Sequence, residues 1–257
     1  MKRVACIAML TAITGAALAT EIPLGERRSG YSFMGPDTRA MQDEDTANPG
    51  MLWVLDGETL WKRKAGTADK ACADCHDDAR VSMKGVAARY PAFDKSLGKP
   101  VDLEGRINLC RSNHQQATPL RHESRELLAL TAYVAEQSRG MPIVAGNDTD
   151  LAPFVAKGHE LFTRRQGQLN LACANCHDDN WDKKLAGAPI TQGQPTGYPL
   201  YRLEWQSLGS LQRRLRACIT GIRAQAYDYG SPELVELELY LMTRARGMNI
   251  ETPAVRP

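Results

Sequence analysis

The stretch CANCHDDN at residues 173–180 has a near copy, ACADCHDDA, at residues 71–79, so the chain contains Cys-x-x-Cys-His twice. This spacing is typical of covalent haem attachment, because two thiols on one turn reach the two vinyl groups of a single porphyrin. The adjacent histidine then lies under the iron. A zinc site would need two further ligands for each motif. The sequence therefore predicts two covalently bound c-type haems, with these attachment cysteines and iron-binding histidines: Cys72, Cys75 and His76; Cys173, Cys176 and His177.

The two motifs belong to a tandem duplication. At an offset of 101 residues, Gly57 matches Gly158 and the haem motifs align. Further along, LEGRINLC, which ends at Cys110, resembles LQRRLRAC, which ends at Cys218, and residues 127–143 resemble residues 235–250. A repeat of about 100 residues indicates a duplicated domain rather than a solenoid. We expect a mainly α fold with two tandem cytochrome c-like domains.

Four segments follow from composition. Residues 1–19 have a basic start, an apolar stretch and an Ala-x-Ala end, which predict a signal peptide cleaved after Ala19 and export to the periplasm. Residues 20–46 form a polar arm that we expect to be irregular. The turn-rich joint near residues 141–153 separates a first half, 47–145, from a second half, 146–257. No later segment is apolar enough to span a membrane.

Helix signals recur at matching places in the two halves. Ser231 and Pro232 are typical of a helix start, and Gly247 can end that helix. Ser124 and Gly140 have the same roles in the first half. The segment 187–199 is expected to be a loop, and no alternation indicates a strand. Without residues 1–19 the chain has 30 basic and 30 acidic residues, which argues against nucleic-acid binding.

Two cysteines outside the haem motifs, Cys110 and Cys218, also match. They can form a disulfide between the halves, or each can be the second axial ligand of its own haem iron. Duplication favours the same role twice, and a thiolate is a good iron ligand, which favours axial ligation. Met141 and Met248 also match; they are the distal ligands that a plain electron carrier would use, or they pack at helix ends. His114, His122 and His159 have no counterparts, which favours surface or core roles.

Arginines gather around Cys218. Arg214 lies four residues before it and shares its helix face, with Arg213, Arg216 and Arg223 nearby. Such charges lower a thiol pKa and attract a small dianion. The alternative is that they bind haem propionates, since Arg106 lies four residues before Cys110.

With these residues in view, the chain resembles the SoxA family of dihaem c-type cytochromes. The resemblance covers nearly the whole chain after residue 19 and rests on both haem motifs, on NLCRSNHQQATPLRHESRELLAL and above all on residues 213–256. It implies an L-cysteine S-thiosulfotransferase that pairs with the monohaem cytochrome SoxX and joins thiosulfate oxidatively to a cysteine of the SoxYZ carrier. It also implies His/Cys ligation of both haems, a catalytic Cys218 that often carries an extra sulfur, and a substrate-binding Arg214.

Three other functions remain as alternatives. A plain periplasmic dihaem electron-transfer cytochrome needs methionine or histidine as the distal ligand and no reactive thiol. A dihaem peroxidase needs an open iron site, which an iron-bound Cys218 would block. In the third alternative the haems only stabilise the fold.

Overall fold

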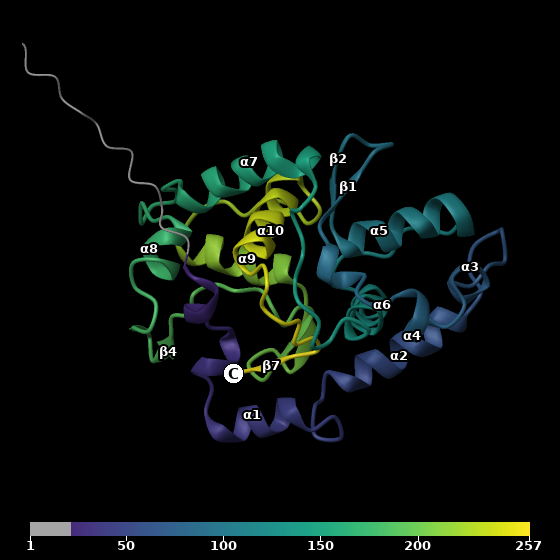
Figure 1. Ribbon diagram of the computed structural model, residues 1–257, viewed down its shortest axis with the longest axis horizontal. Helices are drawn as coiled ribbons and strands as arrows, with labels where there is room; N and C mark the ends of the chain where they lie inside the picture. The colour runs from purple at the N-terminus through teal and green to yellow at the C-terminus, as the bar shows by residue number, and fades with distance from the viewer. Residues whose placement is uncertain (1–21) are drawn as a thin grey trace, which may run out of the picture.

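The computed structural model describes residues 22–257, so the predicted signal peptide lies outside the described residues. The two halves lie side by side, each built around a pair of long helices (Figure 1). Up to residue 145 the elements are η1 (Leu24–Glu26), η2 (Gly30–Phe33), α1 (Pro36–Asp43), α2 (Met51–Lys62), α3 (Ala73–His76), α4 (Ala79–Ser82), η3 (Ala87–Arg89), β1 (Ala92–Asp94), β2 (Lys99–Val101), α5 (Leu103–Cys110), η4 (Arg111–Gln115) and α6 (Arg125–Glu136). The second half contains η5 (Thr149–Leu151), α7 (Ala152–Thr163), α8 (Cys173–His177), β3 (Lys184–Leu185), β4 (Ala188–Pro189), β5 (Leu200–Arg202), β6 (Ser207–Gly209), α9 (Leu211–Gly221), α10 (Pro232–Arg244) and β7 (Val255–Arg256). The mainly α prediction is confirmed.

The helix pairs α2–α6 and α7–α10 form the cores of the two halves. Both α6 and α10 begin as predicted, because the hydroxyls of Ser124 and Ser231 accept hydrogen bonds from the third backbone N–H of each helix. The crossing points need glycine. A Cβ on Gly57 would lie 2.2 Å from the carbonyl oxygen of Ala129, and a Cβ on Gly158 would lie 2.1 Å from the corresponding oxygen of Glu236. The glycines that match in the repeat therefore let two backbones touch at equivalent places.

Short strands are present, so the expectation of no strands was wrong. β1 pairs antiparallel with β2, and β5 pairs antiparallel with β6 and parallel with β7. β3 and β4 form a separate two-residue ladder, within and beside the segment expected to be a loop. Strands of two or three residues are too short to show an alternating pattern, which is why the sequence did not reveal them.

The N-terminal arm is not irregular throughout, because it contains α1. It packs against the second half, beside β7 (Figure 1). The backbone N–H of Arg28 in the arm donates to Oε1 of Gln192 at 2.7 Å. Just after the arm, the side-chain amide of Asn48 donates to the carbonyl of Pro253 at 2.8 Å. Residues far apart in sequence are therefore held together at this edge of the molecule.

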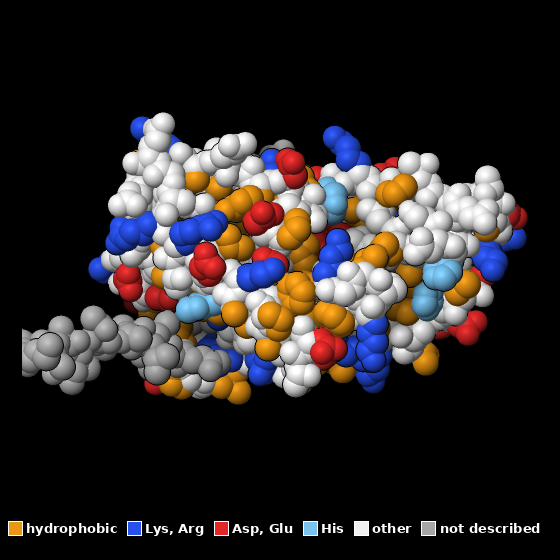
Figure 2. All heavy atoms as spheres, turned by 90° about the horizontal axis from the view of Figure 1, so that it is seen from above, with side chains coloured by type: hydrophobic (Ala, Val, Ile, Leu, Met, Phe, Trp, Pro, Cys, Tyr) orange, Lys and Arg blue, Asp and Glu red, His pale blue; other side chains and the backbone are white. Residues whose placement is uncertain are grey.

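The molecular surface mixes charge types. On the face shown in Figure 2, basic, acidic and hydrophobic side chains are interspersed. Within residues 22–257, every helix is too short or too polar to cross a bilayer.

The halves pair through their matching Arg-Gly-Met segments. The N–H of Ile143 donates to the carbonyl of Met248, and the N–H of Ile250 donates to the carbonyl of Met141, both at 2.9 Å. This exchange is reciprocal, as a local two-fold axis requires. Met141 and Met248 thus lie at the junction of the halves, where Met248 packs on the apolar cluster that includes Ile143 and Ile250.

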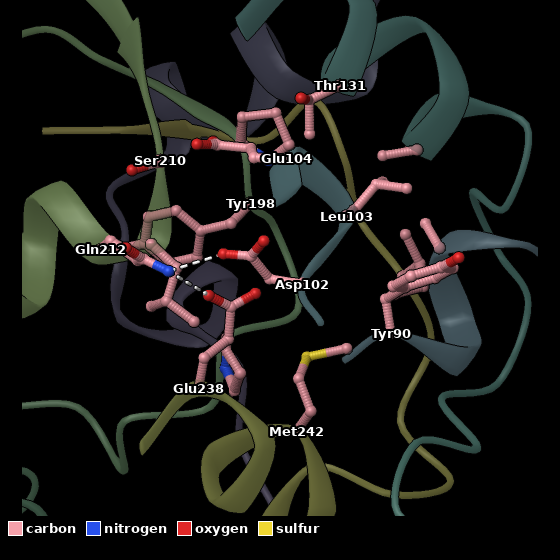
Figure 3. Close-up of a pocket in the computed structure, with 16 residues that line it drawn as sticks. Tyr90, Asp102, Leu103, Glu104, Thr131, Tyr198, Ser210, Gln212, Glu238 and Met242 are labelled. Atoms are coloured by element: carbon pink, nitrogen blue, oxygen red, sulfur yellow. Dashed lines mark hydrogen bonds between the residues drawn. The ribbon is translucent and has the colours of Figure 1, made fainter. Parts of the chain in front are cut away.

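A cavity of about 60 Å³ lies between the halves (Figure 3). Gln212 points into it and donates through Nε2 to Oδ2 of Asp102 at 2.6 Å and to Oε2 of Glu238 at 3.5 Å. Oε2 of Glu104 lies 3.1 Å from Nδ1 of His122. Residues that match in the repeat line the cavity in pairs, including Tyr90 and Tyr198, Asp102 and Ser210, Leu103 and Leu211, Glu104 and Gln212, Thr131 and Glu238.

Protonation of Glu104 is expected to make stability depend on pH. Burial raises the pKa of Glu104 from 4.5 to about 7, although the hydrogen bond with His122 opposes this shift. Between these values the folded chain binds more protons than the unfolded chain, so the free energy of unfolding falls as pH rises. The loss is up to about 3 kcal/mol between pH 4.5 and 7.

Urea unfolding at pH 5 and pH 8 measures this loss, and Glu104→Gln should flatten the profile. Glu160→Gln is the matched control, because the Glu160 side chain is 70% exposed. An unchanged pH profile in Glu104→Gln would contradict the assignment.

Candidate functional site

The first half contains a cavity of about 410 Å³ that gathers its candidate haem residues. Helix α3 follows Cys72 and carries Cys75 and His76, while α5 ends at Cys110. All four side chains line the cavity, which is otherwise mostly apolar. Two neighbouring thiols, an imidazole and a further thiol in one apolar cavity fit a covalently attached haem with His/Cys ligation.

Aromatic and amide contacts fix this motif. The ring of Trp61 lies 5.8 Å from the ring of His76, and its Nε1 donates to the carbonyl of Asp77 at 2.9 Å. Gln115, at the end of the π-helical turn that follows Cys110, donates to the carbonyl of Lys70 at 2.8 Å. The segments around the attachment thiols and Cys110 are thus tied to each other directly.

The second half places His177 against Cys218. Helix α8 ends at His177 and helix α9 carries Cys218, and the imidazole lies close enough to help lower the pKa of that thiol. Nδ1 of His177 lies 2.7 Å from the carbonyl oxygen of Thr191, which makes Nδ1 the donor and leaves Nε2 free to bind a metal. A Cβ on Gly193 would lie 3.2 Å from this ring, so the loop that carries Thr191 closely covers His177.

The two outlying cysteines have different electrostatic environments. Burial raises the pKa of Cys218, but the imidazole of His177 and the charges of Arg214 and Arg202 outweigh burial, so its pKa is lowered. Burial also raises the pKa of Cys110, and the charge of Arg106 does not compensate, so its pKa stays raised. Cys218 is therefore the thiol in the more positive environment.

The arginines near Cys218 in sequence do not all point toward it. The guanidinium of Arg213 lies 4.1 Å from the centre of the Trp205 ring and 3.7 Å from Glu123. Arg216 lies over the ring of Tyr229 at 4.5 Å. Of the four arginines, Arg214 is the one whose charge acts strongly on Cys218.

Several alternatives for these residues lose support. All six cysteines that the structure describes are free thiols, so Cys110 and Cys218 do not form a disulfide. Met141 and Met248 hold the junction between the halves, as described above. His122 pairs with Glu104, and His159 contacts the ring of Tyr240 at 5.2 Å. Within residues 22–257, no group of three or more His, Cys, Asp or Glu side chains could hold a free metal ion.

Sequence reasoning missed residues that lie near the second site. Arg202, at the end of β5, contributes positive charge at Cys218, and half-buried Tyr198 lies in the electrostatic range of Arg214 and Cys218. Thr191 orients His177. The repeat could have drawn attention to two of these residues, because at an offset of 108 residues Tyr198 matches Tyr90 and Arg202 matches Asp94. His114, expected at the surface or in the core, is exposed at the rim of the first cavity.

Known proteins are similar to this chain in sequence and in fold. The model of the SoxA/TsdA cytochrome c domain matches residues 56–143 and 157–250. The L-cysteine S-thiosulfotransferase subunit SoxA of Pseudaminobacter salicylatoxidans is 40% identical over 245 residues, covering 95% of this chain and 86% of the relative. The SoxA subunit of Rhodovulum sulfidophilum is 38% identical, covering 90% and 80%. A crystal structure of SoxXA from P. pantotrophus superimposes with a TM-score of 0.87 at 32% identity, covering 90% of this chain and 87% of the matched chain.

Proposed function

The chain belongs to the SoxA/TsdA cytochrome c family, and on this premise we propose that it is the SoxA-type subunit of an L-cysteine S-thiosulfotransferase. It is a dihaem cytochrome c that oxidatively conjugates thiosulfate to a cysteine of a carrier protein and passes the electrons to c-type haem. The observation that carries this proposal is the position of Cys218. His177 and the charge of Arg214 outweigh burial and lower the pKa of its thiol, whereas burial keeps the pKa of the matching Cys110 raised.

We assign the haem-binding roles by half. Thioether bonds would form at Cys72 and Cys75 in the first half and at Cys173 and Cys176 in the second half. The haem iron would be bound by His76 and Cys110 in the first half, and by His177 and Cys218 in the second half. Bound c-type haem supplies a one-electron acceptor in each half.

The reaction balances with two electrons and one proton. A carrier thiol and thiosulfate become a carrier S-thiosulfonate, and one sulfur–sulfur bond forms as two electrons and one proton leave. In the proposed route, Arg214 holds the anion while the sulfur of Cys218 bonds to the outer sulfur of thiosulfate, and two electrons are released. The carrier thiolate then attacks this outer sulfur and displaces the thiolate of Cys218.

The proposed partners are a SoxX-type monohaem cytochrome c, in a heterodimer, and a SoxYZ-type carrier protein. The fold match to a chain of SoxXA supports the heterodimer. We also propose that the chain is exported to the periplasm after cleavage behind Ala19. The division into 47–145 and 146–257 is supported by the two ranges that match the family model, one of which falls in each half.

A reconstituted reaction tests this function. The haem-loaded chain, with a SoxX-type partner, is mixed with reduced carrier protein, thiosulfate and oxidised cytochrome c. We expect the intact mass of the carrier to rise by one S–SO3 group, with two cytochrome c molecules reduced for each adduct. Electron transfer to cytochrome c without a carrier adduct would instead indicate a plain electron-transfer cytochrome.

A further inference from the structure

The first strands of the two hairpins end at matching residues of opposite charge. β1 ends at Asp94, which pairs with Lys99 of β2, and β5 ends at Arg202, which pairs with Ser207 of β6 in the same register. Each hairpin leads into a cysteine-bearing helix, α5 or α9. Asp94 and Arg202 therefore occupy equivalent positions relative to these two helices.

In the first half, Asp94 neutralises the charge of Arg106. Arg106 is the fourth residue after the N-cap of α5, and its Nη2 lies 2.5 Å from Oδ2 of Asp94. The Asp94 side chain is only 9% exposed, so the ion pair is partly shielded from water. An anion that approaches Cys110 therefore meets a guanidinium that already has a carboxylate partner.

In the second half the equivalent pair consists of two arginines. Arg214 is the fourth residue after the N-cap of α9, and no carboxylate among residues 22–257 forms an ion pair with it. Burial lowers the pKa of Arg202, and the positive charge of Arg214 lowers it further. The exchange of an aspartate for an arginine thus turns a neutral pair into a pair of like charges next to Cys218.

The remaining contacts of Arg202 leave it able to bind an anion. Its Nε donates to the main-chain oxygen of Pro257 at 2.8 Å, and its Nη2 lies 3.0 Å from Glu204. The Glu204 side chain is 65% exposed, so water weakens this pair. The guanidinium also lies 5.2 Å from the centre of the Trp205 ring. Neither hydrogen-bonded contact uses Nη1, and the Arg202 side chain is 16% exposed.

We propose that Arg202 is a second anion-binding residue of the thiosulfate site, and that the difference between Asp94 and Arg202 confines substrate binding to the second half. This inference rests on the proposed function. A dianion needs more than one cation to replace its hydration, and two planar guanidinium groups can each bind sulfonate oxygens through paired hydrogen bonds. Arg214 and Arg202 approach from a helix and a strand, so together they can also orient the anion toward Cys218.

Substitutions of Arg202 in the haem-loaded complex test this role through thiosulfate turnover. For Arg202→Gln we expect the KM for thiosulfate to rise about 10- to 100-fold with kcat nearly unchanged, the effect of losing one charge-assisted hydrogen bond. Arg202→Asp recreates the ion pair of the first half and should raise KM further. Arg202→Lys keeps the charge and should restore most of the affinity.

Arg213→Gln is the matched control, since Arg213 pairs with Glu123 at 3.7 Å and should leave KM unchanged. If Arg202→Asp loses the absorption of the second haem, Arg202→Gln and Arg202→Lys decide the question. A KM within twofold of the wild type in Arg202→Gln, measured beside a clear rise in Arg214→Gln, would overturn the inference.

Calorimetry with sulfate as a competing anion separates this inference from the proposed function. Weaker sulfate binding in Arg202→Gln would support the arginine pair even if the wild-type complex formed no carrier adduct. Equal sulfate binding by the wild type and Arg202→Gln would count against the arginine pair even if conjugation proceeded.

Discussion

Replacing Cys218 by alanine is expected to abolish thiosulfate conjugation, with carrier adduct falling at least about 1,000-fold below the wild type, the scale on which loss of a catalytic nucleophile acts. The side chain is doubly important, because its sulfur would both ligate iron and bond to the outer sulfur of thiosulfate. The measurement is carrier adduct per minute by intact mass, with the absorption spectrum of the second haem recorded in parallel. The spectrum should lose its thiolate signature while both haems remain attached.

Cys110→Ala provides the matched control within the same chain. Cys110 in α5 matches Cys218 in α9. Replacing Cys110 by alanine should therefore change the ligation of the first haem as Cys218→Ala changes that of the second. Conjugation should nevertheless remain within a fewfold of the wild type, because Arg106 is paired with Asp94 and no substrate site is expected there. Equal loss of activity in the two variants would contradict this division of labour between the halves.

Peptide mass spectrometry without reductant gives an independent check. The peptide that contains Cys218 should carry one additional sulfur or an S–SO3 group after exposure to thiosulfate, while the peptide that contains Cys110 should not. A peptide linking the two cysteines would remove both proposed thiolate ligands. In the structure both thiols are free and belong to separate sites.

The sequence alone singled out most of the residues from which the two candidate sites are built. The Cys-x-x-Cys-His spacing has a strict chemical meaning, and the duplication made Cys110 and Cys218 visible as a pair. The mainly α class followed from the same motif and from the helix caps at Ser124 and Ser231. These features succeed because each depends on local spacing along the chain.

The residues that sequence reasoning missed depend on contacts between distant segments. Arg202 lies sixteen residues before Cys218 in a three-residue strand, so no periodic pattern connects the two. Thr191 acts through its backbone carbonyl, which no residue type signals. The clustering of arginines in sequence was also misleading, because Arg213 and Arg216 turn toward Trp205 and Tyr229. Comparison of the two halves at the offset of 108 would have revealed Arg202 opposite Asp94.

Arg214→Gln should raise the KM for thiosulfate about 100-fold or more, the second large effect expected at this site. Arg214 shares the helix face of Cys218, and its charge acts on that thiol. No ion pair within the described residues competes for its guanidinium, so its interaction with an anion is not offset by a lost internal partner. Removing a charged hydrogen-bond donor from a partly buried site costs about 1.5–3 kcal/mol, and a bidentate contact doubles the donors lost.

Arg106→Gln is the control that makes this result specific. Arg106 has the position on α5 that Arg214 has on α9, but Arg106 forms an ion pair with Asp94. Its loss should therefore lower the free energy of unfolding slightly and leave the KM for thiosulfate unchanged. Steady-state rates over a range of thiosulfate concentrations, at fixed ionic strength, measure both variants, because salt screens the attraction of an exposed anion. If Arg106→Gln raised KM as much as Arg214→Gln, the arginines would act through haem propionates in both halves, and the anion site at Cys218 would have to be abandoned.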